Sequence, residues 1–350
     1  MTARVRSSKP NQGDCMRYAI WNNKGGVGKS FVTFLTACEY ARQHPDKAVV
    51  IVDMCPQANV SEVVLGGNGH GAEELQKLLS AKNRRTIGGY FDERISSPQK
   101  ITGNETSYVM QANKFNKNMD ANVWLIAGDP SLEIQAEAIN QIAGQTLPPE
   151  SWANVHLWLK DLLIANAKLH PNMIFFIDCN PSFSAYTELA ILAAERLIVP
   201  CSADGSSARA ISNIGQLIYG INVPAAYASV SFSKRASKFH LPIPRIHTIP
   251  LNRSTQYEQK ASKAFAAMYD AIIKRAQALF KADKTIFSQA KAVFLDIPDA
   301  HSVSVVTSHL GLPLHKIKLG KYKIHAKDTQ VPKDSLVRYK KAFNELVSTL

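Results

Sequence analysis

The hydrophobic pattern divides most of the chain into short apolar runs and longer segments with apolar residues at helical spacing. The run 48–52 shows no polar alternation, which is typical of a parallel strand covered on both faces. Strand candidates are 17–21, 48–52, 123–127, 173–177, 196–200 and 246–251, and helix candidates are 30–42, 132–142, 152–167, 208–219 and 259–281. Strands that alternate with helices of this length predict an α/β fold: a doubly wound, mostly parallel sheet flanked by helices.

The chain shows no internal repeat, and we expect one elaborated core domain with additions. Residues 66–122 are rich in Gly, Asn, Ser and charge, with one short helical stretch at 73–81, and they predict a surface insertion. We expect a flexible N-terminal segment over 1–16, the core over 17–255, and a basic, helical C-terminal part packed on the core over 256–350.

Composition narrows the class of protein. Hydrophobic residues make up 45% and charged residues 20% of the 350 residues, which indicates a folded globular chain. The start is polar and basic without a signal-peptide core, and no apolar run is long enough to span a bilayer. We therefore expect a cytoplasmic protein without an integral membrane segment. The five cysteines form no C-x-x-C pair, which argues against a disulfide framework and against a zinc or iron–sulfur site.

A glycine-rich loop lies between the first predicted strand and the first predicted helix. Glycines let backbone N–H groups turn toward phosphates, Lys29 reaches the β and γ phosphates of a nucleotide, and Ser30 can bind magnesium. The plain P-loop has Gly where this chain has Asn23, so the match is to the deviant form with a second lysine, Lys24. We expect ATP and Mg²⁺ as ligands, with ATP contacts from Lys24, Gly25, Gly26, Val27, Gly28, Lys29, Ser30 and Phe31.

Two aspartates end predicted strands downstream of this loop. Asp53 follows the run 48–52, and Asp178 follows the run 173–177. In a P-loop protein, carboxylates at these strand ends lie beside the phosphates and hold magnesium directly or through water. Strand-end aspartates are often only caps or turn formers. Because both aspartates follow a P-loop in this sequence, we interpret Ser30, Asp53 and Asp178 as the magnesium site.

The motifs together resemble those of the ParA/MinD family of ATPases. Besides the deviant P-loop, the segments 53–59 (DMCPQAN) and 178–182 (DCNPS) resemble the second and third motifs of the family, and the resemblance covers most of 17–255. It implies that Lys24 reaches across a homodimer to the partner's phosphates, so that ATP lies between two subunits. It also implies catalytic roles for Lys24, Lys29 and Asp53, and two switch segments that contain Cys55, Pro56, Gln57 and Asn59, and Asn180 and Pro181. Asn252 and Arg253 resemble the adenine-contacting position, although a turn Asn at a strand end explains Asn252 equally well.

Three positions depart from the family pattern. The family usually has Asp at the position of Cys55, and that carboxylate helps to activate the attacking water, so we expect slow hydrolysis, reliance on Asp53, or completion of the site by a partner. Cys55 also fits the plainer role of a small buried apolar residue. Phe31 replaces a hydroxyl residue, and Asn180 replaces a proline.

Positive charge is concentrated in the last third of the chain. Residues 231–350 hold 21 Lys and Arg against 8 Asp and Glu, which accounts for the whole net charge of +13. Spaced lysines can neutralise successive phosphates, so we interpret this surplus as nonspecific DNA binding rather than as a solvated face. The candidates are Lys234, Arg235, Lys238, Lys316, Lys318, Lys321, Lys323, Arg338, Lys340 and Lys341.

The last residues, 335–350, have the pattern of a basic amphipathic helix. Such a helix can touch a membrane, as in a MinD-like protein, but it more often covers a sheet, which is the role we expect here.

The combined prediction is a ParA-like ATP-binding switch. It forms an ATP-sandwich dimer, binds nucleoid DNA, and positions a plasmid, chromosome or other cargo with a ParB-like or adaptor protein that stimulates hydrolysis. A MinD-like membrane-surface ATPase and a slowly hydrolysing ATP-dependent scaffold are the alternatives.

Overall fold

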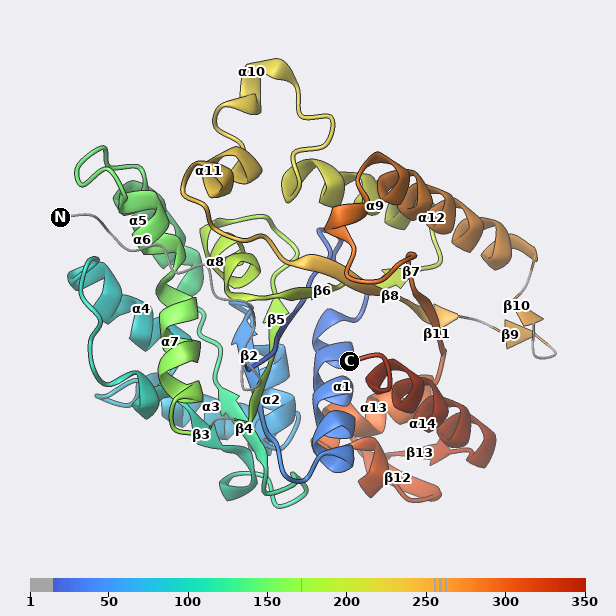
Figure 1. Ribbon diagram of the computed structural model, residues 1–350. Helices are drawn as coiled ribbons and strands as arrows, with labels where there is room; N and C mark the ends of the chain where they lie inside the picture. Colours follow the sequence, from blue (N-terminus) through green and yellow to red (C-terminus); the bar gives the residue numbers. More distant parts are fainter. Residues whose placement is uncertain (1–14, 171, 255, 258–259, 262) are drawn as a thin grey trace.

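The computed structural model describes residues 15–350 except 171, 255, 258–259 and 262. Its centre is a nine-stranded sheet built from β1 (Arg17–Ile20), β2 (Ala48–Met54), β3 (Met110–Gln111), β4 (Val123–Ile126), β5 (Met173–Cys179), β6 (Arg196–Ile198), β7 (Cys201–Ser202), β8 (Arg245–Ser254) and β11 (Phe294–Pro298). The strand order is β11-β8-β6-β1-β5-β2-β4-β3, with β7 paired to β8 (Figure 1). Every pairing in this sheet is parallel except that of β3 with β4, which confirms the predicted fold class.

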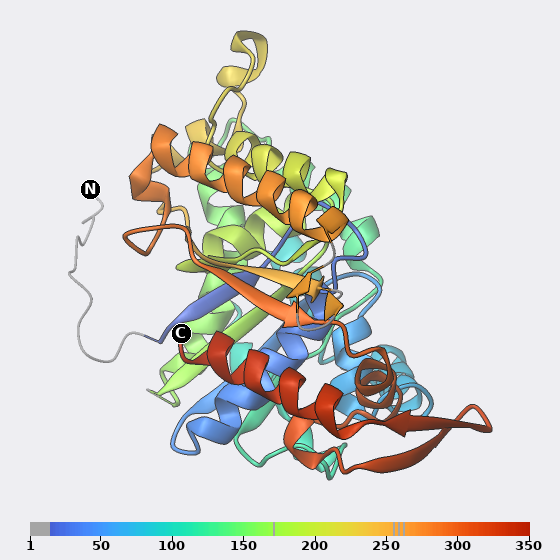
Figure 2. The same ribbon diagram turned by 90° about the vertical axis from the view of Figure 1, so that its right-hand side faces the viewer.

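Helices cover both faces of the sheet. One layer contains α4 (Ile87–Ser96), α5 (Leu132–Ala143), α6 (Ser151–His156), α7 (Trp158–Ala167), α8 (Ala185–Ala193), α9 (Gly205–Leu217) and α12 (Lys263–Ala282). The other contains α1 (Lys29–Gln43), α2 (Asn59–Leu65), α3 (His70–Ser80), α13 (His301–Leu310) and α14 (Lys333–Val347). Figure 2 shows α12 and α14 on opposite sides of the sheet.

The central strands are buried on both faces because their side chains alternate between the two layers. In β2, Val50 and Val52 belong to the core beneath α4–α9, whereas Val49 and Ile51 belong to the core beneath α1. Two apolar faces require a continuous apolar run, which is the sequence pattern that predicted a covered parallel strand.

The segment 66–122 differs in part from the predicted surface insertion. It forms α3 and α4 and the short strand β3, which extends the sheet by pairing antiparallel with β4. Ile87, Tyr90 and Phe91 in α4 are fully buried. Their spacing of three and four residues places them on one side of the helix, and that side packs into the core.

The C-terminal part is less helical than expected. β11 joins the main sheet beside β8, and β12 (Gly320–Ile324) pairs with β13 (Lys327–Val331) in a separate hairpin. The terminal helix α14 buries its apolar face: Leu336, Phe343 and Leu346 are at most 4% exposed. Residues 1–14 of the expected N-terminal segment lie outside the described residues.

The remaining elements connect these layers. They are α10 (Ala225–Ala228), α11 (Phe232–Lys238), the small hairpin of β9 (Gln256–Tyr257) with β10 (Lys260–Ala261), and the 3-10 turns Glu105–Tyr108, Ala112–Lys114, Lys284–Ile286 and Leu314–Lys316.

Candidate functional site

The glycine-rich loop leaves β1 and ends where α1 begins at Lys29, at the carboxyl end of the parallel strands. Gly26 and Gly28 have φ angles of 73° and 81°, a left-handed region that favours glycine. A Cβ at Gly28 would also collide with the side-chain amide of Asn252. Val27, between them, is buried and anchors the loop. The loop therefore has the strand–loop–helix geometry that directs backbone N–H groups toward an anion.

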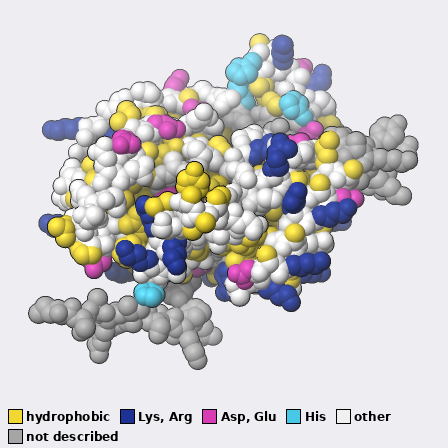
Figure 3. Space-filling view, turned by 90° about the horizontal axis from the view of Figure 1, so that it is seen from above, with side chains coloured by type: hydrophobic (Ala, Val, Ile, Leu, Met, Phe, Trp, Pro, Cys, Tyr) yellow, Lys and Arg dark blue, Asp and Glu magenta, His cyan; other side chains and the backbone are white. Residues whose placement is uncertain are grey.

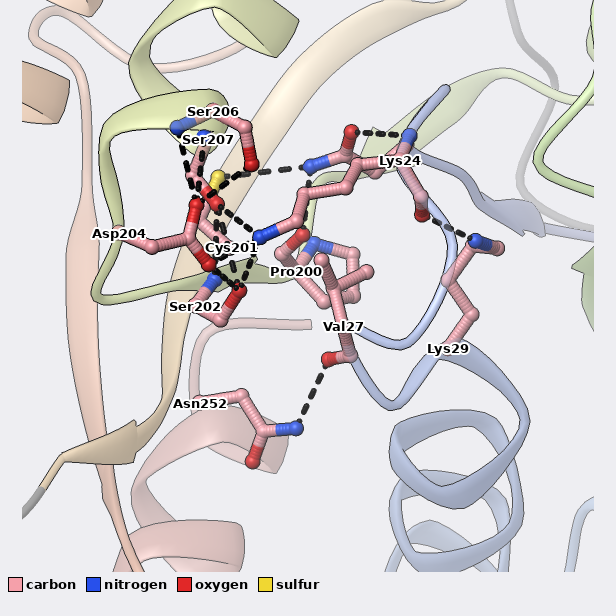
Figure 4. Close-up of polar contacts among 11 residues, drawn as sticks. Lys24, Val27, Lys29, Pro200, Cys201, Ser202, Asp204, Ser206, Ser207 and Asn252 are labelled. Atoms are coloured by element: carbon pink, nitrogen blue, oxygen red, sulfur yellow. Dashed lines mark hydrogen bonds and ion pairs between the residues drawn. The ribbon is translucent and has the colours of Figure 1, made fainter.

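Lys29 lies at the first position of α1 with its ammonium group beneath the loop. Its Nζ donates a hydrogen bond to the Lys24 carbonyl oxygen at 2.8 Å, and the residue is 7% exposed (Figure 4). Burial lowers the pKa of Lys29, and the nearby carboxyl group of Asp178 opposes that shift. A buried ammonium group is destabilising without a paired negative charge, and a phosphate bound at the loop would provide that charge.

Asp53 and Asp178 are direct neighbours on β2 and β5, and both are fully buried. Asp53 accepts hydrogen bonds from the backbone N–H of Cys55 at 3.0 Å and from the N–H and hydroxyl of Ser61 at 3.0 and 2.7 Å. Thr33 donates to Asp178 Oδ1 at 3.3 Å, whereas Asp178 Oδ2 is buried without a hydrogen-bond partner among the described residues.

The two carboxyl groups resist ionisation in this arrangement. Burial raises the pKa of Asp53 to about 6, and burial together with repulsion from Asp53 raises the pKa of Asp178 to about 7. A divalent cation beside Ser30 would offset this repulsion and would engage the unpartnered oxygen of Asp178. Magnesium therefore fits the donor set that the sequence indicated.

A cavity of about 520 Å³ opens above these groups. Its size is ordinary for a small-molecule site. The loop, α1, both predicted switch segments, α2 and α13 line it, through Gly25, Gly26, Gly28, Lys29, Ser30, Phe31, Phe34, Cys55, Gln57, Asn59, Glu62, Val63, Asn68, Cys179, Asn180, Pro181 and Ser308. Pro56, in the first switch segment, is buried beside it. The structure thus brings the loop and both switch segments to one cavity.

The three residues that depart from the family pattern, Cys55, Phe31 and Asn180, each have defined surroundings in the structure. Burial, with repulsion from Asp53 and Asp178, raises the pKa of Cys55 to about 12, so its thiol is neutral at physiological pH. Phe31 stacks on Tyr339 of α14, with ring centroids 6.0 Å apart. The backbone carbonyl of Asn180 accepts a hydrogen bond from the Trp21 indole at 2.8 Å.

Asn252 lies under the loop. Its Nδ2 donates to the Val27 carbonyl oxygen at 2.9 Å, and the residue is 2% exposed (Figure 4). This contact positions the loop, and the predicted adenine contact remains a prediction. The side chain of Arg253 lies outside the described residues.

Lys24 turns away from the cavity and binds residues of its own chain. Its Nζ donates to the Ser202 hydroxyl at 2.9 Å and forms an ion pair with Asp204 (Figure 4). Asp204 also caps α9 by accepting the N–H groups of Ser206 and Ser207, each at 3.0 Å. Although burial raises the pKa of Asp204, the hydrogen bonds from Lys24 and these serines outweigh that effect and hold it well below its usual range.

The predicted DNA-binding residues do not form one surface. Lys234, Arg235 and Lys238 lie on α11, whereas the other predicted residues lie between 316 and 341, in and around the β12–β13 hairpin and α14. Figures 1 and 2 place α11 and this hairpin at opposite ends of the molecule. Arg235 and Lys340 are half-buried, and the other eight candidates are exposed.

Some of these lysines have acidic partners. Lys321 pairs with Asp328 at 3.6 Å, and Lys316 lies 3.7 Å from Asp120. Three further exposed cations, Lys274, Arg275 and Lys281, lie on α12 and were not among the predicted DNA-binding residues. Figure 3 shows more Lys and Arg side chains on the half of the molecule that carries α12. Within the part of the chain that the structure describes, no helix combines the length and apolar character needed to cross a bilayer.

The fold and the loop together define the class of P-loop nucleotide-binding proteins. A family model described as an AAA domain matches residues 16–224, well over half of the chain. The chain therefore belongs to this family, and its deviant loop makes it a ParA/MinD-like P-loop ATPase. A comparison with curated protein sequences gives no match.

Solved structures share this fold at low sequence identity. An ATP complex of McdA from Cyanothece has a TM-score of 0.62 and 14% identity, covering 96% of each chain. A putative plasmid partition protein from Borrelia burgdorferi bound to AMPPNP has a TM-score of 0.53 and 16% identity, covering 96% of this chain and all of that chain. Cobyrinic acid a,c-diamide synthase from Mycobacterium smegmatis, with ADP and magnesium, has a TM-score of 0.54 and 15% identity, covering 96% of this chain and 93% of that chain.

Two features of the site were missing from the sequence prediction. Asp204 and Ser202 hold Lys24, and the only local signal was that an Asp before Gly-Ser-Ser is a helix-cap pattern. Glu62 lines the cavity, but no motif includes it.

Proposed function

We propose that this chain is an ATP-controlled dimerising switch of the partition type. The observation that carries the proposal is the arrangement of one loop with two lysines: Lys29 lies under the loop beside the aspartate pair, and Lys24 sits at the loop surface on a partly exposed ion pair. A lysine buried beside the phosphates can bind nucleotide within one chain. A second lysine that can leave Asp204 for a phosphate of another subunit can make dimerisation depend on the bound nucleotide.

Nucleotide binding would use the cavity and its floor. The N–H groups of the loop and the Lys29 ammonium group would bind phosphate oxygens, and Ser30, Asp53 and Asp178 would hold Mg²⁺. Magnesium would neutralise charge on the β and γ phosphates. The solved neighbours with ATP, AMPPNP, or ADP and magnesium support this part of the proposal.

Dimerisation would follow from the release of Lys24. A γ phosphate presented by a second subunit would compete with Asp204 for the Lys24 ammonium group, and this contact would exist only in the closed dimer. A contact made in one of two states is what a nucleotide switch requires. Hydrolysis would remove the phosphate, and Lys24 would return to Asp204.

DNA would be bound through exposed cations of the last third of the chain, with affinity that falls as salt rises. The neighbours named as McdA and as a plasmid partition protein are the reason to propose positioning of cargo, with a ParB-like or adaptor protein as the activator. We propose a cytoplasmic, nucleoid-associated location on the same basis.

The MinD-like alternative has less support from the structure. It requires the apolar face of α14 to reach a membrane, but Leu336, Phe343 and Leu346 on that face are buried in the core beneath α1. The scaffold alternative rests on the neutral thiol of Cys55. If Cys55→Asp does not raise ATP turnover, the main argument for a slowly hydrolysing scaffold is lost.

The switch is tested by the oligomeric state in each nucleotide state. Sedimentation velocity of the full chain should show monomers without nucleotide and with ADP, and dimers with ATP or a slowly hydrolysed analogue in the presence of Mg²⁺. The same mass in all four conditions would contradict the switch.

A further inference from the structure

One acidic residue lines the cavity above the P-loop. Of the described residues that line it, only Glu62 is acidic, whereas Asp53 and Asp178 are fully buried and do not line it. Two thiols, Cys55 and Cys179, also line the cavity. Both cysteines are buried, so Glu62 is the acidic candidate for a proton acceptor in the described lining.

Glu62 is held in place by the structure that also holds Asp53. It lies in the first turn of α2, directly after Ser61, whose N–H and hydroxyl both donate to Asp53. The Glu62 backbone N–H donates to the Ala58 carbonyl oxygen at 3.1 Å, which closes the first turn. The backbone of Glu62 is therefore held next to Ser61, the residue that fixes the candidate metal ligand Asp53.

The Glu62 carboxylate has no competing partner in the described part of the chain. Among the described residues no hydrogen bond or ion pair engages this carboxylate, burial raises its pKa, and its charge repels that of Asp53. A carboxylate that is partly desolvated and unpaired is a better proton acceptor than one in an ion pair. A structural role as an acidic residue near a helix N-terminus would not require Glu62 to line the cavity.

We propose that Glu62 is the general base for ATP hydrolysis in this chain, a role that deepens the proposed function and rests on it. The Glu62 carboxylate accepts a proton from a water molecule as the water oxygen bonds to the γ phosphorus. The bond from that phosphorus to the β–γ bridging oxygen breaks, and its electron pair stays on ADP, where Lys29 stabilises the charge. The products are ADP and inorganic phosphate, and Glu62 then releases its proton to solvent.

The test compares Glu62→Gln with Glu73→Gln in the full chain. Gln keeps the size of Glu62 but cannot accept the proton, and Glu73 is an exposed residue of the neighbouring helix α3 that does not line the cavity. We expect Glu62→Gln to lower the kcat for ATP hydrolysis by about 100-fold, while the affinity for a fluorescent ATP analogue stays unchanged. Glu73→Gln should change neither quantity.

A second readout does not depend on turnover. In the presence of ATP, Glu62→Gln should accumulate dimers as long-lived as those formed with a slowly hydrolysed analogue, because the bound ATP persists. Adding Cys55→Asp to Glu62→Gln should restore turnover from the other wall of the cavity.

The outcomes separate this inference from the switch itself. An unchanged kcat in Glu62→Gln would contradict the proposed role of Glu62 as general base. A loss of nucleotide affinity equal to the loss of turnover would also contradict it, because that result would indicate a structural role. If the unaltered chain forms ATP-dependent dimers but does not hydrolyse ATP, the role of Glu62 as general base is contradicted and the dimerising switch is not. If hydrolysis depends on Glu62 but no dimer forms, the role of Glu62 is supported and the dimerising switch is contradicted.

Discussion

The ammonium group of Lys24 contacts the carboxylate of Asp204 within one chain. Ser202 adds a hydrogen bond to the same ammonium group at 2.9 Å, and Asp204 simultaneously caps α9. The lysine expected to reach a second subunit therefore has a partner within its own chain. The proposed dimer would have to break this pair, so the strength of the pair would contribute to the threshold of the proposed switch.

Replacing Asp204 with Asn tests that contribution. Asn retains an oxygen that caps α9 but lacks the charge that holds Lys24. Because a partly exposed ion pair contributes up to about 1 kcal/mol, Asp204→Asn should tighten the ATP-dependent dimer by about two- to fivefold for each pair released. Sedimentation equilibrium with the ATP analogue measures this, with Ser206→Ala as a control that leaves the charge intact. A weaker dimer in Asp204→Asn would show that Asp204 supports the interface.

Alanine substitutions of the two loop lysines should impair different functions. Lys29→Ala removes the charge beneath the phosphates and should abolish nucleotide binding. Lys24→Ala should retain binding and lose the dimer, because Lys24 lies off the cavity on Asp204. Titration with a fluorescent nucleotide and sedimentation velocity separate the two defects. Equal ATP-dependent dimerisation by both variants would be incompatible with the proposed switch.

The aspartate pair predicts an unusual pH dependence of stability. Folding raises the pKa values of Asp53 and Asp178 to about 6 and about 7, above their unfolded values, so the folded state holds more protons between pH 4 and pH 7. Their contribution to stability is therefore greatest at low pH, is lost as the pH rises through this window, and stays low above it.

Asp178→Asn removes one of the two charges, so it should raise the thermal midpoint of the nucleotide-free chain at pH 8. Each kcal/mol regained corresponds to about 2–4 °C. The same variant should lose the additional stabilisation that Mg²⁺ gives with ATP. Calorimetry at pH 5 and pH 8 measures both effects, and an equal midpoint shift at the two pH values would contradict the assigned pKa direction.

Two glycines of the loop should differ in their tolerance of alanine. Gly28 has a φ of 81° and faces Asn252, whereas nothing lies within 4 Å of a Cβ placed at Gly25, whose φ is not in the left-handed region. Gly28→Ala should cost about 1–3 kcal/mol of unfolding free energy, and Gly25→Ala should cost far less. Urea unfolding without nucleotide compares them, and similar losses would contradict this loop geometry.

The two basic clusters can be tested separately because they lie at opposite ends of the molecule. Alanine at Lys318, Lys321 and Lys323 should weaken DNA binding and reduce the slope of log K against log salt by up to about 3. The matched set on α11 is Lys234, Arg235 and Lys238. Unchanged affinity and slope in both triple variants would exclude these clusters as the DNA contact.

The sequence predicted the parts of the site that follow from short-range chemistry. The loop needs glycines at left-handed positions, and the strands that end in Asp53 and Asp178 need continuous apolar runs, so both features are visible as patterns. Their adjacency also followed, since the carboxyl ends of parallel strands meet at one edge of the sheet.

The features that were missed depend on contacts between distant segments. Lys24 and Asp204 are 180 positions apart, and the sequence pattern shows only the helix cap of Asp204. β11 pairs with β8 and becomes the edge strand of the sheet, and α4 is buried because one side of it meets the core. The composition of 66–122 does not reveal the apolar side of α4, because Gly and charged residues are interspersed with its apolar residues in the sequence.

The most direct test of the account is DNA binding by the purified chain without nucleotide, with ADP, with ATP and with a slowly hydrolysed ATP analogue, each over a series of salt concentrations. We expect tight binding only with ATP or the analogue and a steep fall with salt. Dimers that form with ATP but do not bind DNA, or binding that is equal in all nucleotide states, would contradict it.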